Sequence, residues 1–291
     1  MQLAASNLMF PAFDHAEFLP RVAELGIKGV EVAPYHTFPE LTSGAALTQA
    51  VSEYWAAAFS AGLRITGLRG LTEQPLDVEE LAFGATRRRH MEELLLLSAV
   101  CRDLGGSTLS LGARRRGSLL ESSAQELLRE FLEELIPKLE AHGTVLCLSP
   151  LLPEEGDVLV TANDCNNLSL YFDHPALGVE LGTDVLTRGG DGLPMGEGRV
   201  GHTIFALCEH QLYLFRLDEP ERAVIGSSNT IDHIDFRLHL QASRYEGWMP
   251  ILQDAPNGRD PIAALKQARD FVQGAYFPAG DDREQERKRR C

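Results

Sequence analysis

Short apolar runs alternate with longer segments of helical periodicity along most of the chain. The runs are rich in Val, Ile and Leu, which is typical of strands that are covered on both faces. We therefore predict eight strands, at residues 3–6, 29–33, 64–68, 108–112, 145–148, 178–181, 212–217 and 248–252.

Between these runs, apolar residues recur three and four positions apart, which predicts helices. Gly26 and Gly62 each follow directly after such a segment, as glycine commonly does at the end of a helix. Pro261 stands in the first turn of the last one, where proline is well tolerated. The predicted helices cover residues 14–25, 45–61, 86–104, 124–141, 161–168, 199–207, 234–243 and 260–276, and a glycine-rich loop is predicted over 188–198.

Eight strand–helix units within 291 residues fit a single (β/α)8 barrel of the α/β class better than an open, doubly wound sheet. No change in composition marks a domain boundary before residue 280, so we expect one barrel domain over residues 1–279. Residues 280–291 (GDDREQERKRRC) are dense in charge and lack core residues. They are predicted to form a disordered tail.

The formal net charge of −15 argues against nucleic acid or an anionic membrane as the main partner, because both favour basic surfaces. The five cysteines form no CxxC pair, which favours a reduced, cytoplasmic setting. We see no signal peptide and no apolar run of the roughly 18 residues that a membrane span needs. A small-molecule substrate is the expected partner, and the sequence leaves open whether the chain forms a homodimer.

In a (β/α)8 barrel, functional groups gather at the carboxyl-terminal ends of the strands. Glu31 interrupts an apolar strand (GVEVA), so its charge needs either a function or a buried partner such as Arg69. Arg69, Arg114 and Arg216 lie near the ends of three strands and are expected to converge on a phosphate or carboxylate. Solvated loop arginines are the alternative.

Further candidates follow other strands. Asp218 could offer a carboxylate to a substrate or serve only in a turn, while His36 and His233 could act as general acid or base or lie unused at the surface. Asn7 and Asp184 end the first and sixth strands and are expected to contact the substrate. Phosphate-loop, dinucleotide, serine-hydrolase and zinc motifs are absent from the sequence, so no cofactor is expected.

Several segments together resemble a known family. SNLMF, ELGIKGVEVAP and FPE near the amino terminus, FRLDEP, and DHIDF followed by YEGWMPI are similar to motifs of the sugar phosphate isomerase/epimerase group of xylose isomerase-like TIM barrels. The similarity runs from residue 3 to about residue 276. It implies a (β/α)8 barrel that acts on a small sugar-like carbonyl compound.

Members of that group usually hold one divalent cation with Glu, Asp, His and Glu from four strand ends, and the cation stabilises an enediolate. By resemblance, the first ligand position is Ser149 and the second is Gly182, with Asp184 reachable by a two-residue slip. The histidine position falls on Phe215, and the last glutamate position on Leu252 or Gln253. Neutral and apolar residues cannot hold a hard dication, and Asp184 would supply one ligand but not the set, so no metal is expected.

We therefore expect a metal-independent isomerase, epimerase or lyase, with Glu31 or Asp218 as base and with Arg216 and Arg69 stabilising an oxyanion. The alternative is a non-catalytic barrel that binds a metabolite or scaffolds a partner protein. An enzyme should enclose a cavity of several hundred cubic ångströms, whereas a scaffold should expose a broad apolar patch.

Overall fold

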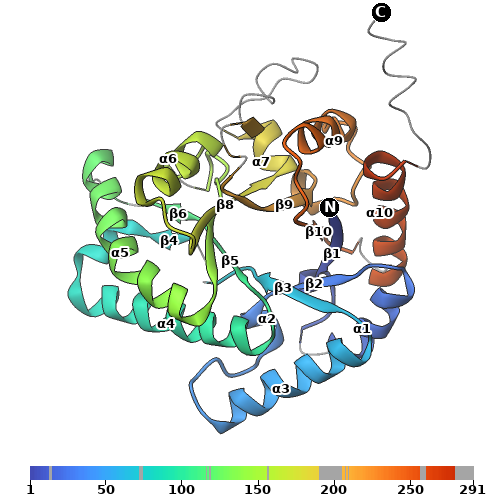
Figure 1. The fold of residues 1–291 in the computed structure, drawn as a ribbon, viewed down its shortest axis with the longest axis horizontal. Helices are drawn as coiled ribbons and strands as arrows, with labels where there is room; N and C mark the ends of the chain where they lie inside the picture. Colours follow the sequence, from blue (N-terminus) through green and yellow to red (C-terminus); the bar gives the residue numbers. More distant parts are fainter. Residues whose placement is uncertain are drawn as a thin grey trace, which may run out of the picture.

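A computed structural model describes residues 1–12, 15–71, 75–115, 117, 119–155, 157–189, 205–206, 208, 210–255 and 260–278. Its central feature is a closed barrel of parallel strands in the order β1-β10-β9-β8-β7-β5-β3-β2, surrounded by helices (Figure 1). The first strand pairs with the last, which closes the sheet. The predicted (β/α)8 barrel is confirmed.

The eight barrel strands occupy the places that the apolar runs predict. They are β1 (Gln2–Ser6), β2 (Gly29–Val32), β3 (Arg64–Leu68), β5 (Thr108–Leu111), β7 (Val145–Leu148), β8 (Leu177–Gly182), β9 (Leu212–Asp218) and β10 (Trp248–Leu252). All residues of β2, β5 and β8 are buried, because helices cover one face and the barrel interior the other.

The helices form the outer ring, and their apolar sides pack on the barrel (Figure 1). Gly143 ends α5 in the left-handed conformation (φ 72°), which glycine adopts without steric cost. The helices are α1 (His15–Glu24), α2 (Pro34–Thr37), α3 (Ala45–Ser60), α4 (Gly84–Asp103), α5 (Glu121–His142), α6 (Ala162–Phe172), α7 (Thr183–Arg188), α9 (His233–Ala242) and α10 (Pro261–Tyr276), with 3-10 turns η1 (Asn7–Met9), η2 (Val78–Ala82) and η3 (Pro220–Arg222).

Two features of the barrel mouth are not predicted by periodicity. Helix α7 begins directly after β8, and a small parallel sheet pairs β4 (Leu76–Asp77) with β6 (Ala113–Arg114). Both are too short to show a repeating pattern of apolar residues. Most of the predicted loop 188–198 and helix 199–207, and the predicted tail 280–291, lie outside the described residues.

Among the helices that the structure describes, none has both the length and the apolar character that crossing a bilayer requires.

Candidate active site

A cavity of about 560 Å³ opens at the carboxyl-terminal mouth of the barrel. Its described lining comes from the ends of β3, β5, β7, β8, β9 and β10 and the segments that follow them, and not from β1 or β2. Enzymes of this fold place their active sites at this mouth. The charged and hydroxyl-bearing lining residues are Arg69, Ser110, Ser149, Glu154, Glu155, Asp184, Arg188, Arg216, Asp218, Glu219, Glu221 and Arg222.

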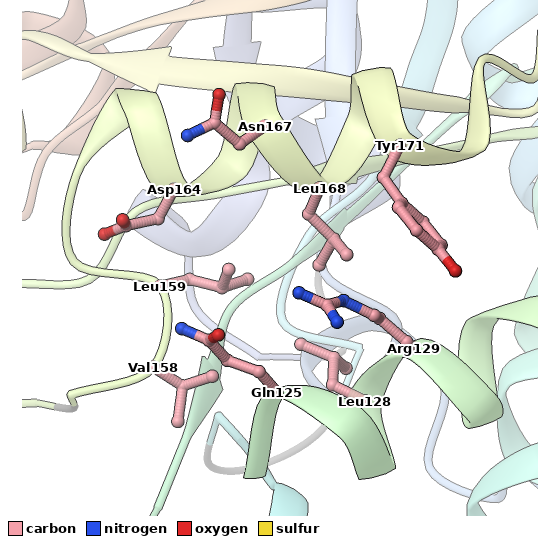
Figure 2. A pocket seen from close by; sticks show the side chains of 9 residues that line it. All are labelled: Gln125, Leu128, Arg129, Val158, Leu159, Asp164, Asn167, Leu168 and Tyr171. Carbon is pink, nitrogen blue, oxygen red and sulfur yellow. The ribbon is translucent and has the colours of Figure 1, made fainter. Parts of the chain in front are cut away.

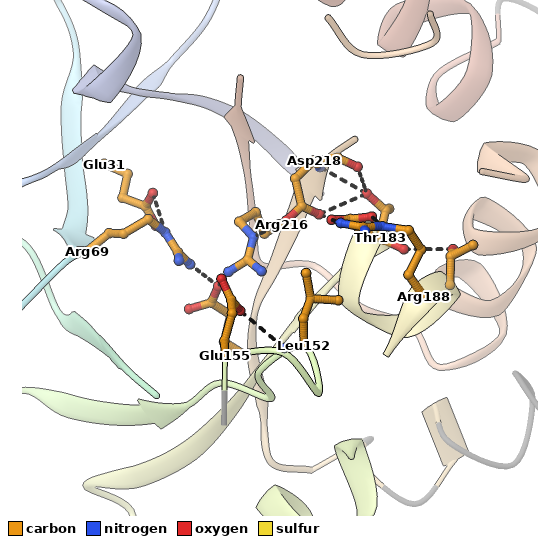
Figure 3. Close-up of polar contacts among 11 residues, drawn as sticks. Glu31, Arg69, Leu152, Glu155, Thr183, Arg188, Arg216 and Asp218 are labelled. Carbon is orange, nitrogen blue, oxygen red and sulfur yellow. Dashed lines mark hydrogen bonds and ion pairs between the residues drawn. The ribbon is translucent and has the colours of Figure 1, made fainter. Parts of the chain in front are cut away.

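Two arginines and three carboxylates form one ion-pair network beneath this cavity (Figure 3). Arg69 donates from Nε to Oε2 of Glu31 (2.9 Å) and from Nη2 to Oε1 of Glu180. Arg216 donates from Nη1 to the same oxygen of Glu180 (2.5 Å) and from Nε to Oδ2 of Asp218 (2.6 Å). Three negative and two positive charges leave a formal net charge of −1.

The network is buried, and burial shapes its electrostatics. Glu31 and Glu180 are 1% and 0% exposed. Burial lowers the pKa of Arg69 to about 10; the charge of Glu31 opposes the shift and that of Arg216 adds to it. Burial alone lowers the pKa of Arg216 as well, but the neighbouring Asp218 and Glu31 outweigh it and raise that pKa. Both guanidinium groups therefore remain charged at neutral pH.

The network retains hydrogen-bonding capacity toward the cavity. Arg69 and Arg216 both line it, and among the described residues no hydrogen bond engages Nη1 of Arg69 or Nη2 of Arg216. Deeper in the barrel, Oε1 of Glu31, Oε2 of Glu180 and Oγ of Ser6 are buried without a partner in the described part of the chain. The floor can thus donate to an oxygen atom of a ligand.

Asp218 connects this network to the start of α7. Its Oδ1 accepts hydrogen bonds from the backbone N–H of Asp184 (2.9 Å) and from the hydroxyl of Thr183 (3.1 Å). Asp184 is in turn held by Arg188, whose Nε and Nη2 lie 2.5 and 2.6 Å from its two carboxylate oxygens. Asp218 is thus fixed in place at the cavity wall.

Glu31 occupies a different position from the one a catalytic base requires. It lies beneath Arg69 and does not line the cavity. The buried pair with Arg69, which the sequence leaves open, is confirmed. Glu180 was not among the predicted site residues, although it interrupts the apolar strand GVELG in the same way as Glu31 interrupts GVEVA. That pattern was the available signal.

Asn7 and His36 lie away from the cavity, contrary to the expected role in substrate binding. Asn7 is buried and joins the ends of β1 and β2: its Nδ2 donates to Oγ1 of Thr37 (2.8 Å), and its Oδ1 accepts from the N–H of Ala33 (2.8 Å). His36 places Nε2 2.7 Å from the carbonyl oxygen of Phe10. Both side chains serve contacts within the fold.

Arg114 does not converge with Arg69 and Arg216. It belongs to β6, and it lines a separate groove of about 1030 Å³ beside α4, because the small β4–β6 sheet turns it away from the barrel axis.

A third cavity, of about 250 Å³, lies outside the barrel between α5 and α6, where Arg129 stacks on Tyr171 with 5.2 Å from Cζ to the ring centre (Figure 2). Neither holds the ion-pair network.

His233 also fails to reach the cavity. It begins α9, is buried, and contacts Glu219 through Nε2 (3.0 Å) and Tyr276 through Nδ1 (2.9 Å). Glu219 lies between it and the cavity, so a direct acid–base role for His233 does not fit this geometry.

The structure corrects one of the metal-ligand positions inferred by resemblance. Phe215 points outward, with its ring 5.6 and 5.8 Å from those of Phe205 and Phe236. Because side chains alternate along a strand, Arg216 is the inward residue at this level of β9. The group at the centre of the site is therefore a guanidinium.

The other ligand positions do not suit a divalent cation either. Ser149 and Leu252 line the cavity, and Gln253 accepts a hydrogen bond from the N–H of Ile225 (3.1 Å). A Cβ atom at Gly182 would lie 2.7 Å from Nη2 of Arg216, so a cation there would meet a positive charge. Asp184 is engaged by Arg188, and the described residues contain no group of three or more His, Cys, Asp or Glu that could hold a metal ion.

Comparison with solved structures finds the same fold in sugar epimerases. D-psicose 3-epimerase from Clostridium cellulolyticum H10 superposes with a TM-score of 0.76 at 18% identity, covering 95% of this chain and 99% of that one. A 3-keto-D-glucoside 4-epimerase from E. coli gives 0.74 at 17% identity, over 94% and 99%. An L-ribulose 3-epimerase gives 0.76 at 16% identity, over 100% and 97%. At these identities the likeness establishes the fold.

No curated protein sequence matches the chain. A family model described as "Xylose isomerase-like TIM barrel" matches residues 19–274, which includes all barrel strands except β1 and all the residues of the ion-pair network. The chain belongs to the xylose isomerase-like TIM barrel family.

Proposed function

We propose that the mouth cavity is the active site of an isomerase, epimerase or lyase that acts on a small, sugar-like carbonyl compound without a divalent metal. Family membership, a cavity of about 560 Å³ at the mouth, and the sugar epimerases with the same fold support this proposal. One observation carries it: the guanidinium of Arg216 lies at Gly182, where the family's metal ligands would converge.

The proposed chemistry begins with Asp218, the one carboxylate of the network that lines the cavity. Its carboxylate removes a proton from the carbon next to the substrate's carbonyl group, and the electron pair of that C–H bond forms an enolate. The N–H groups of Arg69 and Arg216 that face the cavity stabilise the oxyanion. In a substrate with a hydroxyl group on that carbon, the hydroxyl proton passes to the oxyanion. The carboxylic acid of Asp218 then returns its proton to the former carbonyl carbon, so the carbonyl group forms at the neighbouring carbon and the isomerisation is complete.

A lyase reaction begins in the same way. In that case the enolate electrons expel a leaving group from the next carbon, and Asp218 passes its proton to that group. The position of the substrate's leaving group decides between the two outcomes, since the floor of the cavity serves both. Glu31 is not needed as a base in either, because its role is to hold Arg69.

A non-catalytic barrel that binds a metabolite is the second candidate. It is favoured by one observation: each carboxylate of the network is already paired with a guanidinium group. A binding protein of this kind would retain ligands in the cavity but would transfer no proton.

The test is uptake of deuterium from D2O at the carbon next to the carbonyl, followed by NMR, with D-fructose, D-tagatose and D-psicose as probes. The protein is dialysed against EDTA first. We expect exchange by the wild type, loss of roughly 100-fold or more in Asp218→Asn, and no change in Asp235→Asn, a control on α9. Binding of a probe without exchange would favour the non-catalytic barrel.

Glu31→Gln separates the two possible bases. We expect it to lower stability and to weaken exchange less than Asp218→Asn does, because Glu31 acts only through Arg69. A complete loss of exchange in Glu31→Gln, with exchange intact in Asp218→Asn, would instead identify Glu31 as the base.

A further inference from the structure

We propose that His233 is a positioning residue, which holds the loop between β9 and α9 (residues 219–232, the β9–α9 loop) against the cavity. The inference rests on the proposed function in one respect, namely that this cavity is the substrate site. The loop supplies three lining residues, Glu219, Glu221 and Arg222. His233 itself is buried behind them.

Glu219 is the anchor of the loop. Its Oε1 accepts hydrogen bonds from the N–H of Gly226 (2.8 Å) and from Nε2 of His233 (3.0 Å), and its Oε2 accepts one from the hydroxyl of Ser228. Burial alone raises the pKa of Glu219, but the donors His233, Ser228 and Gly226 outweigh it and lower that pKa. Three donors hold its two carboxylate oxygens, so Glu219 serves as the anchor of the loop.

His233 is fixed from its other side by α10. Its Nδ1 lies 2.9 Å from the hydroxyl of Tyr276. Burial, together with the charges of Glu219, Asp218 and Asp232, raises the pKa of Tyr276 well above its ordinary value. The hydroxyl therefore keeps its proton and holds the ring at Nδ1. Because the carboxylate of Glu219 can only accept, Nε2 of His233 is the donor in their contact.

The loop needs such an anchor because its backbone is strained. Glu221 and Arg222 are consecutive non-glycine residues in the left-handed region, with φ of 55° and 52°. This conformation persists only where surrounding contacts enforce it. Here it presents both side chains to the cavity. Without the anchor, we expect Glu221 to relax and to withdraw from the cavity wall, while the carbonyl oxygen of Arg222 stays bonded to the N–H of Asp254.

A second set of contacts confines the effect to the loop. The carbonyl oxygen of Arg222 accepts from the N–H of Asp254 (2.8 Å), and Oε1 of Gln253 accepts from the N–H of Ile225 (3.1 Å). Both partners follow β10. They do not depend on His233, so the barrel should stay intact when the anchor is lost.

Hydrogen–deuterium exchange of the full chain, followed by mass spectrometry without ligand, tests the proposal. The N–H of Gly226 is the direct reporter, since it donates to Glu219. We expect peptides of the β9–α9 loop to exchange roughly tenfold faster in His233→Leu, with the barrel strands unchanged. His233→Gln should restore protection, because its amide N–H can donate to Glu219. His239→Leu, on the same helix, should leave the loop unchanged.

Three results would overturn the proposal: wild-type loop exchange in His233→Leu, failure of His233→Gln to restore protection, or equally faster exchange in β9 and β10. Should His233→Leu not fold, Glu219→Gln weakens the same contact from the other side and should also expose the loop. Because this assay needs no substrate, absence of turnover would contradict the proposed function and leave the positioning role standing.

Discussion

The guanidinium of Arg216 lies against the backbone of Gly182, so close that a Cβ atom at residue 182 would be 2.7 Å from Nη2 and 3.1 Å from Cζ. This contact joins two neighbouring strands, since Gly182 and Arg216 are register partners in β8 and β9. A side chain at residue 182 would therefore press on the guanidinium that reaches Glu180 through Nη1.

Gly182→Ala should therefore displace Arg216 and destabilise the protein by about 1–3 kcal/mol, as overpacking of a core commonly does. Urea unfolding measures the change. Gly84→Ala is the matched control, because a Cβ atom at Gly84 meets nothing within 4 Å. Equal stability of the two variants would show that Arg216 is not held where the structure places it.

Different substitutions of Glu180 should lower the free energy of unfolding by different amounts. Glu180→Ala leaves two buried guanidinium groups without a shared acceptor and should cost about 3–5 kcal/mol. Glu180→Gln should cost less, because it keeps an acceptor oxygen and cancels the excess negative charge of the network. The free energy of unfolding of both variants decides this, and an equal loss in both would contradict the account.

Asn7→Ala should destabilise the fold by about 2–3 kcal/mol, because Thr37 and the N–H of Ala33 lose a buried partner. The exposed Asn167→Ala on α6 should change stability little. If Asn7→Ala left the free energy of unfolding unchanged and abolished activity, that result would support the contact with substrate that the sequence predicts.

Glu219 gives a pH dependence with a defined sign. Its pKa is lower in the folded protein than the 4.5 of a free glutamate, so it stabilises the fold above pH 4.5, and this contribution is lost as the pH falls through the folded value. Wild type should exceed Glu219→Gln in stability at pH 7, and the gap should narrow below pH 4.5. The free energy of unfolding of both proteins, measured at a series of pH values, gives this difference. A difference that does not change with pH would contradict the role assigned to Glu219.

The barrel could be predicted because each strand is a short apolar run and each major helix has a regular apolar face. Short mouth elements lack such a repeat, so α7 and the β4–β6 sheet were missed. This matters for Arg114, whose direction depends on that small sheet. Strand ends alone therefore do not show which arginines meet.

The site was predictable only in part. Glu31 stood out as a charge in a buried strand, and Arg69 was a stated partner, but the sequence does not show that Arg69 covers Glu31 from the cavity. The alternation in β9 is obscured because Phe215 and Arg216 are both buried. Whether Arg216 faces the axis becomes clear only once its partner Glu180 is located.

If guanidinium groups take the place of a divalent cation, proton exchange should not depend on added or removed metal. The rate of deuterium uptake by a probe ketose is measured for the wild type before and after EDTA dialysis, and again after Mn²⁺ is restored. The account predicts the same rate in all three. A rate that is lost with EDTA and recovered with Mn²⁺ would contradict it.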